Sequence, residues 1–301
     1  MKTVLVTGAS GDVAAHLRRE LAGRYKLRLS DLRPLQGKAK GESFMKADIS
    51  RMADALRITK GVDAIVHLGG YSVEGPWEAI LQANIIGCYN IFEAARRNGV
   101  KRILFATSNH AVGFYRRERT IDHAVYIKPD GRYGVSKVFG EALGSLYADK
   151  YGMEVFLMRI GNVNAKPIDK RRLSILFTPR DLAQLVSIGI DHPDIRFEIV
   201  YGVSGNKRSW YDNSNAYRLG YKPLDDSEAF AAEIVARGEV EHPVGGLFQG
   251  GAFTHVEEVP NPAPLPKKAA ATKAAVKKKA AKKRAAGPRR KVSKRSPRAG
   301  R

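Results

Sequence analysis

The chain has 301 residues, of which 44% are hydrophobic, so it can bury one large core or two modest ones and is typical of a globular protein. Its single cysteine, Cys88, excludes an intrachain disulfide and a multi-cysteine metal site, and the seven histidines show no metal-binding spacing. No apolar run could span a bilayer, and a strand-like segment rather than a signal peptide follows Met1, which together predict a cytoplasmic protein.

The net charge of +22 is distributed unevenly along the chain. Residues 261–301 contain 16 Lys or Arg and no Asp or Glu, which leaves +6 for residues 1–260. We therefore predict two different parts, a globular part over residues 1–259 and a basic tail over residues 260–301.

The first predicted strand, residues 2–7, leads through a glycine-rich turn into an amphipathic helix that extends to about Leu21. Such a turn lets the backbone approach a pyrophosphate, whose negative charge is favoured at the helix N-terminus. The cofactor contacts predicted here are Gly8, Ser10, Gly11, Asp12 and Val13. Because Ala14 takes the third glycine position, an ordinary strand-to-helix turn is the alternative.

A second predicted strand, residues 26–30, ends at Asp31, twenty residues after Gly11. A carboxylate at this place holds the ribose hydroxyls of NAD and repels the extra phosphate of NADP, so the sequence favours NAD as the cofactor. Arg33 is near enough to weaken this preference, and Asp31 could instead cap the following turn.

The next two predicted strands, one from about residue 43 and one over residues 64–68, end in residues that could line the cofactor. The contacts predicted there are Asp48, Ile49, Leu68 and Gly69. Glycine at the carboxyl end of a strand leaves room for a ligand. An acidic residue just before a helix also caps that helix, so a capping role for Asp48 fits equally well.

A long helix over about residues 76–98, which includes Asn84, precedes a fifth strand over residues 102–107. This alternation predicts an α/β fold with a Rossmann-type, doubly wound parallel sheet, whose ligands bind at the carboxyl ends of the strands. The residues that directly follow the fifth strand, and so should line the crevice, are Ser108, Asn109 and His110. His110 could also be a buried structural histidine.

Tyr133 begins the next helix and Lys137 follows one turn later, so the phenol and the ammonium project from one face. Because tyrosine loses its proton near pH ~10, proton abstraction at neutral pH requires roughly three pKa units, about 4 kcal/mol, from nearby positive charge. Lys137 and an oxidised nicotinamide could supply this together. On most helices such a pair is only a solvated face, so its meaning depends on the rest of the chain.

A sixth strand over residues 155–160 precedes a region, residues 180–237, that contains no second set of acid/base residues. The elements predicted in this region are helices over 181–190 and 227–237 and a strand over 197–201. We expect residues 161–259 to supply most of a small substrate-binding part that folds over the crevice.

In order and spacing, these residues resemble the extended short-chain dehydrogenase/reductase superfamily. Three segments, HLGGYSVE at 67–74, SNHAVGFY at 108–115 and PDGRYGVSK at 129–137, look like the NAD-dependent uronate dehydrogenases, and the likeness extends over nearly all of residues 1–255. The resemblance implies that Tyr133 is the acid/base and that Lys137 lowers its pKa and binds the nicotinamide ribose. It further implies that Ser108 orients the substrate oxygen, that Asn84 supports a proton-relay water, and that the protein is a homo-oligomer.

A uronic acid as substrate agrees with the residue types in these segments. Arg171 can hold the carboxylate through two charge-assisted hydrogen bonds, with Arg172 as an immediate rival. The residues expected to bind the sugar hydroxyls are Ser72, Asn109 and His110. Phe248 either closes the sugar pocket or packs the C-terminal segment. The expected reaction is oxidation of galacturonate or glucuronate at the anomeric carbon to a lactone by NAD, with no metal.

The tail, from Pro260 onward, resembles the tails of linker histones and bacterial histone-like proteins. We expect it to be disordered and to bind nucleic acid without sequence preference, or else to act only as a solubilising extension. A membrane partner is disfavoured because no apolar anchor accompanies the charge. Two other functions stay open: a nucleotide-sugar epimerase or dehydratase of the same superfamily, and an NAD-responsive nucleic-acid-binding protein.

Overall fold

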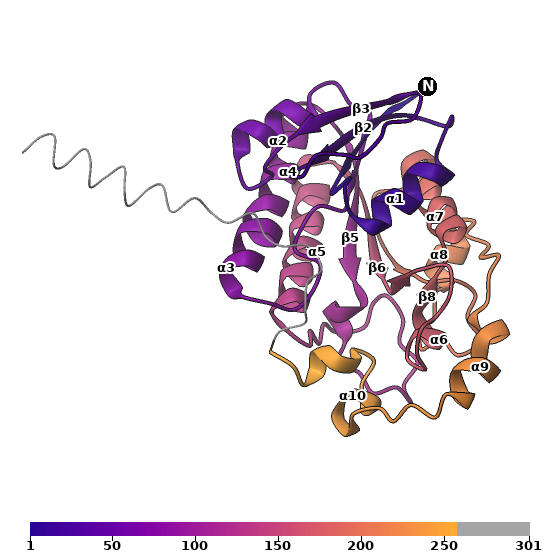
Figure 1. The fold of residues 1–301 in the computed structure, drawn as a ribbon. Coiled ribbons are helices and arrows are strands. Elements are labelled where there is room, and N and C mark those ends of the chain that lie inside the picture. The colour runs from indigo at the N-terminus through magenta and orange to yellow at the C-terminus, as the bar shows by residue number, and fades with distance from the viewer. Residues whose placement is uncertain (258–301) are drawn as a thin grey trace, which may run out of the picture. The chain divides into compact units, whose positions relative to one another are not determined.

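The computed structural model describes residues 1–257, which belong to one compact unit (Figure 1). The predictions made for the basic tail lie outside the described residues. Within the described part of the chain, no helix combines the length and the apolar character that crossing a membrane requires.

Seven parallel strands form the central sheet, which confirms the predicted fold class. In spatial order they are β3 (Glu42–Lys46), β2 (Lys26–Asp31), β1 (Thr3–Thr7), β4 (Ala64–His67), β5 (Arg102–Ser108), β6 (Glu154–Ile160) and β9 (Phe197–Gly202). The order reverses between β1 and β4, and this switch point is where open parallel sheets bind ligands at their carboxyl ends.

Helices cover both faces of the sheet (Figure 1). The face with α1 (Asp12–Glu20) and α7 (Pro179–Asp191) is opposite the face with α2 (Met52–Thr59), α4 (Gly87–Arg97) and α5 (Arg132–Tyr151). Because side chains alternate along a strand, Val4 and Val6 of β1 enter the first core while Leu5 enters the second. The continuous apolar runs in the sequence therefore correspond to strands that are buried on both faces.

The helix predicted over residues 76–98 is present but irregular. It consists of α3 (Trp77–Ile80), a π-helical turn over Leu81–Ile86, and α4. The sequence pattern did not predict the π-helical turn, which contains Asn84. Such turns are rare and often occur at functional sites.

The C-terminal part consists of short elements, several of which the sequence did not predict. They are β7 (Asn162–Val163), α6 (Arg172–Ile175), β8 (Leu176–Phe177), α8 (Ser214–Arg218), α9 (Ala231–Ala236), α10 (Pro243–Leu247) and 3-10 helices over Ser227–Phe230 and Gly251–Thr254. A further 3-10 helix, Asn109–Val112, directly follows β5. We call residues 248–257 the C-terminal segment. It lies against the loop after β5. Gln249 N donates to Tyr115 O and Gly250 N donates to Gly113 O, each at a donor–acceptor distance of 2.9 Å.

A buried ion pair ties α5 to the sheet. Arg159 of β6 donates from Nε and NH2 to the two carboxylate oxygens of Glu141 on α5, over 3.0 and 2.9 Å. The Thr107 hydroxyl on β5 donates to the same carboxylate over 2.8 Å. Since both charged side chains are buried, these hydrogen bonds compensate the loss of hydration and fix the middle of α5 against the ends of β5 and β6.

Candidate active site

Tyr133, Lys137 and Ser108 come together where β5 ends and α5 begins. Tyr133 is only 8% exposed, and the Lys137 ammonium lies 5.3 Å from the centroid of its ring. Lys137 Nζ donates to the Ala106 carbonyl of β5 over 2.8 Å, which fixes the ammonium inside the protein. Ser108 is the last residue of β5, and its Oγ accepts from His110 N over 3.2 Å.

Burial has opposite effects on the two ionisable groups. It raises the pKa of the Tyr133 phenol to about 12, a shift that a hydrogen bond from Ser108 opposes and the charge of Asp130 increases. It lowers the pKa of the Lys137 ammonium to about 8. Among the neighbouring side chains, therefore, Ser108 is the group that opposes the effect of burial on the pKa of Tyr133. Additional positive charge is needed before the phenol can act as a base near pH 7.

Asn84 uses its side chain within the protein. Its Oδ1 accepts from Tyr71 N over 2.7 Å, while its Nδ2 donates to Tyr71 O over 3.0 Å and to Ser136 Oγ over 2.9 Å. The side chain thus joins the loop after β4 to α5. Asn84 was predicted to support a relay water. Because both Nδ2 hydrogens are already used, such a water could hydrogen-bond only to the second lone pair of Oδ1.

The predicted dinucleotide-binding turn has the geometry that a pyrophosphate requires. Gly8 has a φ of +69°, and a Cβ there would lie 2.9 Å from the backbone of Gly69, so β1 and β4 approach closely at the switch point. Gly11 caps α1 without a side-chain hydrogen bond, and a Cβ on it would approach only Gly8 O, at 3.3 Å. The first N–H groups of α1 are therefore left for an anion, and the residues present fit NAD.

The acidic residues predicted to contact the cofactor have partners of their own. Asp31 accepts from Ser10 N over 3.0 Å and from Arg33 N over 2.9 Å. Asp48 Oδ1 accepts from the Ser50 backbone N–H and hydroxyl over 2.9 and 2.6 Å, in the turn before α2, whose N-cap is Arg51 and not Asp48. Asp31 therefore joins the glycine-rich turn to the end of β2, the place predicted for the ribose.

Arg171 and Asn109 form the second polar group of the site. Arg171 Nε donates to Gln249 O over 2.7 Å. When its amide is oriented to satisfy its neighbours, Asn109 donates to Ile160 O over 3.1 Å and accepts from Arg171 NH2 over 2.8 Å. The rival Arg172 instead pairs with Asp169. Gly251, which has a φ of +65°, lies so close to Arg171 that a Cβ there would be 2.5 Å from its Cδ.

The other predicted substrate contacts are less directly placed. Ser72 is exposed in the loop after β4. Phe248 lies edge-on to Phe114, with 5.5 Å between ring centroids. The aromatic ring at the centre of the site is Phe253, which the sequence reasoning missed: it stacks on His110 at 3.7 Å and is 6.0 Å from Tyr133. Its position in the short segment after the two adjacent glycines was the only available signal.

Two buried carboxylates were also missed. Asp130 accepts from His110 Nδ1 over 2.7 Å, and its side chain is 0% exposed. Glu74 accepts from Tyr133 N over 2.9 Å and from Arg132 Nε over 2.8 Å. Both are in segments quoted above for their resemblance, but burial of a particular carboxylate cannot be read from sequence.

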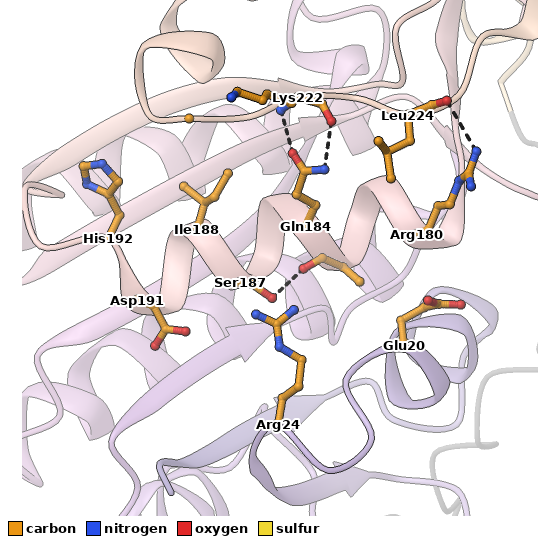
Figure 2. A pocket seen from close by; sticks show the side chains of 12 residues that line it. Glu20, Arg24, Arg180, Gln184, Ser187, Ile188, Asp191, His192, Lys222 and Leu224 are labelled. Carbon is orange, nitrogen blue, oxygen red and sulfur yellow. Dashed lines mark hydrogen bonds between the residues drawn. The ribbon is translucent and has the colours of Figure 1, made fainter.

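A separate surface groove of about 670 Å³ lies between α1 and α7 (Figure 2). None of the predicted site residues lines it. Gln184 exchanges two hydrogen bonds with the backbone of Lys222, over 2.8 and 2.6 Å, and Arg180 pairs with Asp225. The groove holds charges of both signs and contains no acid/base pair comparable to Tyr133 and Lys137.

Comparisons with known proteins identify the relatives of this chain. The model of the NAD dependent epimerase/dehydratase family matches residues 4–188. The uronate dehydrogenase of Pseudomonas putida is 42% identical over 253 residues, covering 83% of this chain and 94% of that protein. The crystal structure of uronate dehydrogenase from Agrobacterium tumefaciens has a TM-score of 0.81 at 42% identity, covering 84% of this chain and 97% of that chain, and a mutant of it has been solved with NAD. The chain therefore belongs to the NAD dependent epimerase/dehydratase family, in which uronate dehydrogenases are its relatives.

Proposed function

We infer that this protein is an NAD-dependent uronate dehydrogenase that oxidises a uronic acid at its anomeric carbon to the lactone. The observation that carries the proposal is that two consecutive residues, Asn109 and His110, lie against Arg171 and Tyr133 respectively. Asn109 contacts Arg171, and the ring of His110 is 5.8 Å from that of Tyr133. A proton acceptor and a carboxylate binder are thereby linked through two adjacent residues of one 3-10 helix.

The roles of the residues follow from their contacts. Tyr133 accepts the proton of the anomeric hydroxyl, Ser108 orients that oxygen and stabilises the phenolate, and Lys137 of α5 adds positive charge from its fixed place against β5. NAD, when bound, supplies the hydride acceptor and the positive charge of its ring. The residues that would hold it are those of the glycine-rich turn, Asp31 and the chain at Leu68 and Gly69, with Asp48 and Ile49 on the adenine side.

Arg171 is suited to the carboxylate of the substrate. Nε donates to Gln249 and Nη2 to Asn109, while Nη1 has no hydrogen-bond partner among the described residues and Nη2 keeps a second hydrogen, so both can donate to a carboxylate. Burial lowers the pKa of Arg171, and an anionic ligand would offset this cost of burying its charge. The C-terminal segment covers this side of the site, which favours a small sugar acid over a nucleotide sugar. A purely sensory fold would not need Ser108, Tyr133 and Lys137 together.

The first test replaces Tyr133 with Phe and follows NADH formation from NAD with galacturonate or glucuronate. Loss of the acid/base should lower kcat at least about a hundredfold while NAD binding persists. Tyr126→Phe, at an exposed tyrosine, is the matched control and should be neutral. Absence of turnover by the unmodified protein with either sugar, despite NAD binding, would remove the uronate proposal.

Exchanging Arg171 and Arg172 separately for Gln separates the two rival arginines. Losing charge-assisted hydrogen bonds to the substrate should raise the KM for the uronate about tenfold or more in Arg171→Gln. Arg172→Gln, which loses only its pair with Asp169, should stay near the parent value. Steady-state kinetics with the uronate varied decide this, and the reverse ranking would assign the carboxylate to Arg172.

Removing the Ser108 hydroxyl tests how the base is tuned. The hydrogen bond from Ser108 lowers the pKa of Tyr133, so Ser108→Ala should move the rise of kcat/KM with pH to higher pH. Turnover near pH 7 then falls and recovers partly in alkaline buffer. A uniform loss at every pH would mean that Ser108 only positions the substrate.

We propose from the sequence alone that residues 260–301 bind nucleic acid through phosphate contacts. The support is their 16 Lys and Arg without an acidic residue. Deleting the tail should abolish retention on DNA at low salt and leave uronate turnover nearly unchanged. A large loss of turnover would instead show that the tail and the enzyme are coupled.

A further inference from the structure

His110 and Asp130 form a buried pair beside the proposed base. His110 is in the 3-10 helix after β5, and Asp130 is in the turn before α5. Their side chains meet over 2.7 Å between Nδ1 and Oδ2, and Asp130 N donates to His110 O over 3.3 Å. The two residues are therefore joined by both side chain and backbone, although they are twenty positions apart.

The pair fixes which nitrogen of His110 carries the proton. A carboxylate only accepts hydrogen bonds, so Nδ1 must be the donor, and in a neutral imidazole Nε2 is then the acceptor. Among the described residues nothing hydrogen-bonds to Nε2. The ring itself is held between Phe253, stacked at 3.7 Å, and Tyr133, at 5.8 Å. Nε2 is thus the one atom of the ring left for a ligand.

The carboxylate is enclosed by two glycines from different parts of the chain. A Cβ at Gly113 would lie 1.8 Å from Asp130 Oδ2, and a Cβ at Gly250 would lie 1.9 Å from it. Within residues 1–257 the other oxygen, Oδ1, is buried without a hydrogen-bond partner. Because a buried carboxylate with so few hydrogen bonds is costly, packing alone is a poor explanation for its presence.

We propose that Asp130 is a positioning residue that holds His110 with Nδ1 protonated, so that Nε2 accepts a hydrogen bond from a sugar hydroxyl next to the reacting carbon. This rests on the proposed function. Asp130 does not touch the substrate and acts through His110. Its negative charge also reaches the base, since it adds to the effect of burial in raising the pKa of Tyr133.

The test compares Asp130→Asn, His110→Gln and the double variant with the unmodified full-length protein. Asp130→Asn keeps the shape that the two glycines require but removes the charge and the requirement for a proton on Nδ1. We expect the KM for the uronate to rise about tenfold, because a sugar hydroxyl is left without its acceptor, with the KM for NAD unchanged. In the His110→Gln background the same substitution should add less than about twofold.

Two further measurements separate positioning from a structural role. Removing the charge of Asp130 should move the rise of kcat/KM with pH to lower pH, because that charge raises the pKa of Tyr133. Asp122→Asn, at an exposed aspartate in the preceding loop, is the matched control and should change neither KM nor the pH profile. Additive effects in the double variant, or equal damage to the KM values for NAD and the uronate, would overturn the proposal.

Nitrogen NMR of His110 decides the tautomer without any turnover. The His110 signals are identified by their loss in His110→Gln. We expect the ring to be protonated on Nδ1 in the parent protein, and we expect its protonation pattern to change in Asp130→Asn. A ring protonated only on Nε2 in the parent would overturn the inference even if the enzyme were active. If neither uronate were oxidised, the proposed function would fail while this measurement still decided the role of Asp130.

Discussion

The position of helix α5 depends on charged groups that are neutralised inside the protein. Arg159 and Thr107 hold the Glu141 carboxylate, and the Lys137 ammonium donates to the Ala106 carbonyl, so two neighbouring strands fix one helix at two levels. Buried polar contacts tolerate little displacement, because each broken contact would leave a charge or a donor without a partner. The same contacts also fix the proposed base, since Tyr133 is in the first turn of this helix.

Most of the fold was predictable because it depends on local chemistry. Apolar runs, the glycine-rich turn and helix periodicity predicted the strands β1 to β6 within one or two residues. The π-helical turn around Asn84 was not predictable, because it differs from an α-helix by only one hydrogen-bond register. The short elements after β6 carry too few residues for a periodic pattern, so their sequences alone do not determine them.

The candidate site was predictable where a residue type has few alternative uses. Tyr133, Lys137 and Ser108 lie close together in the structure. Arg171 contacts Asn109 and Gln249, whereas Arg172 pairs with Asp169. Phe253 rather than Phe248 stacks on His110, and because both belong to the same short segment only tertiary contacts distinguish them. Asp130 escaped notice since a carboxylate before a helix is ordinarily read as part of a turn.

Because of the C-terminal segment, cofactor binding and sugar binding require different lengths of the chain. The proposed cofactor turn, base and activating lysine all come before residue 138, whereas Gly250 encloses Asp130 and Gly251 fits against Arg171. During synthesis the nucleotide-binding sheet can therefore assemble while the sugar pocket is still unfinished. Chemistry on the sugar has to wait for nearly the last residues of the globular part, so an interrupted translation product would bind dinucleotide without being a competent oxidant.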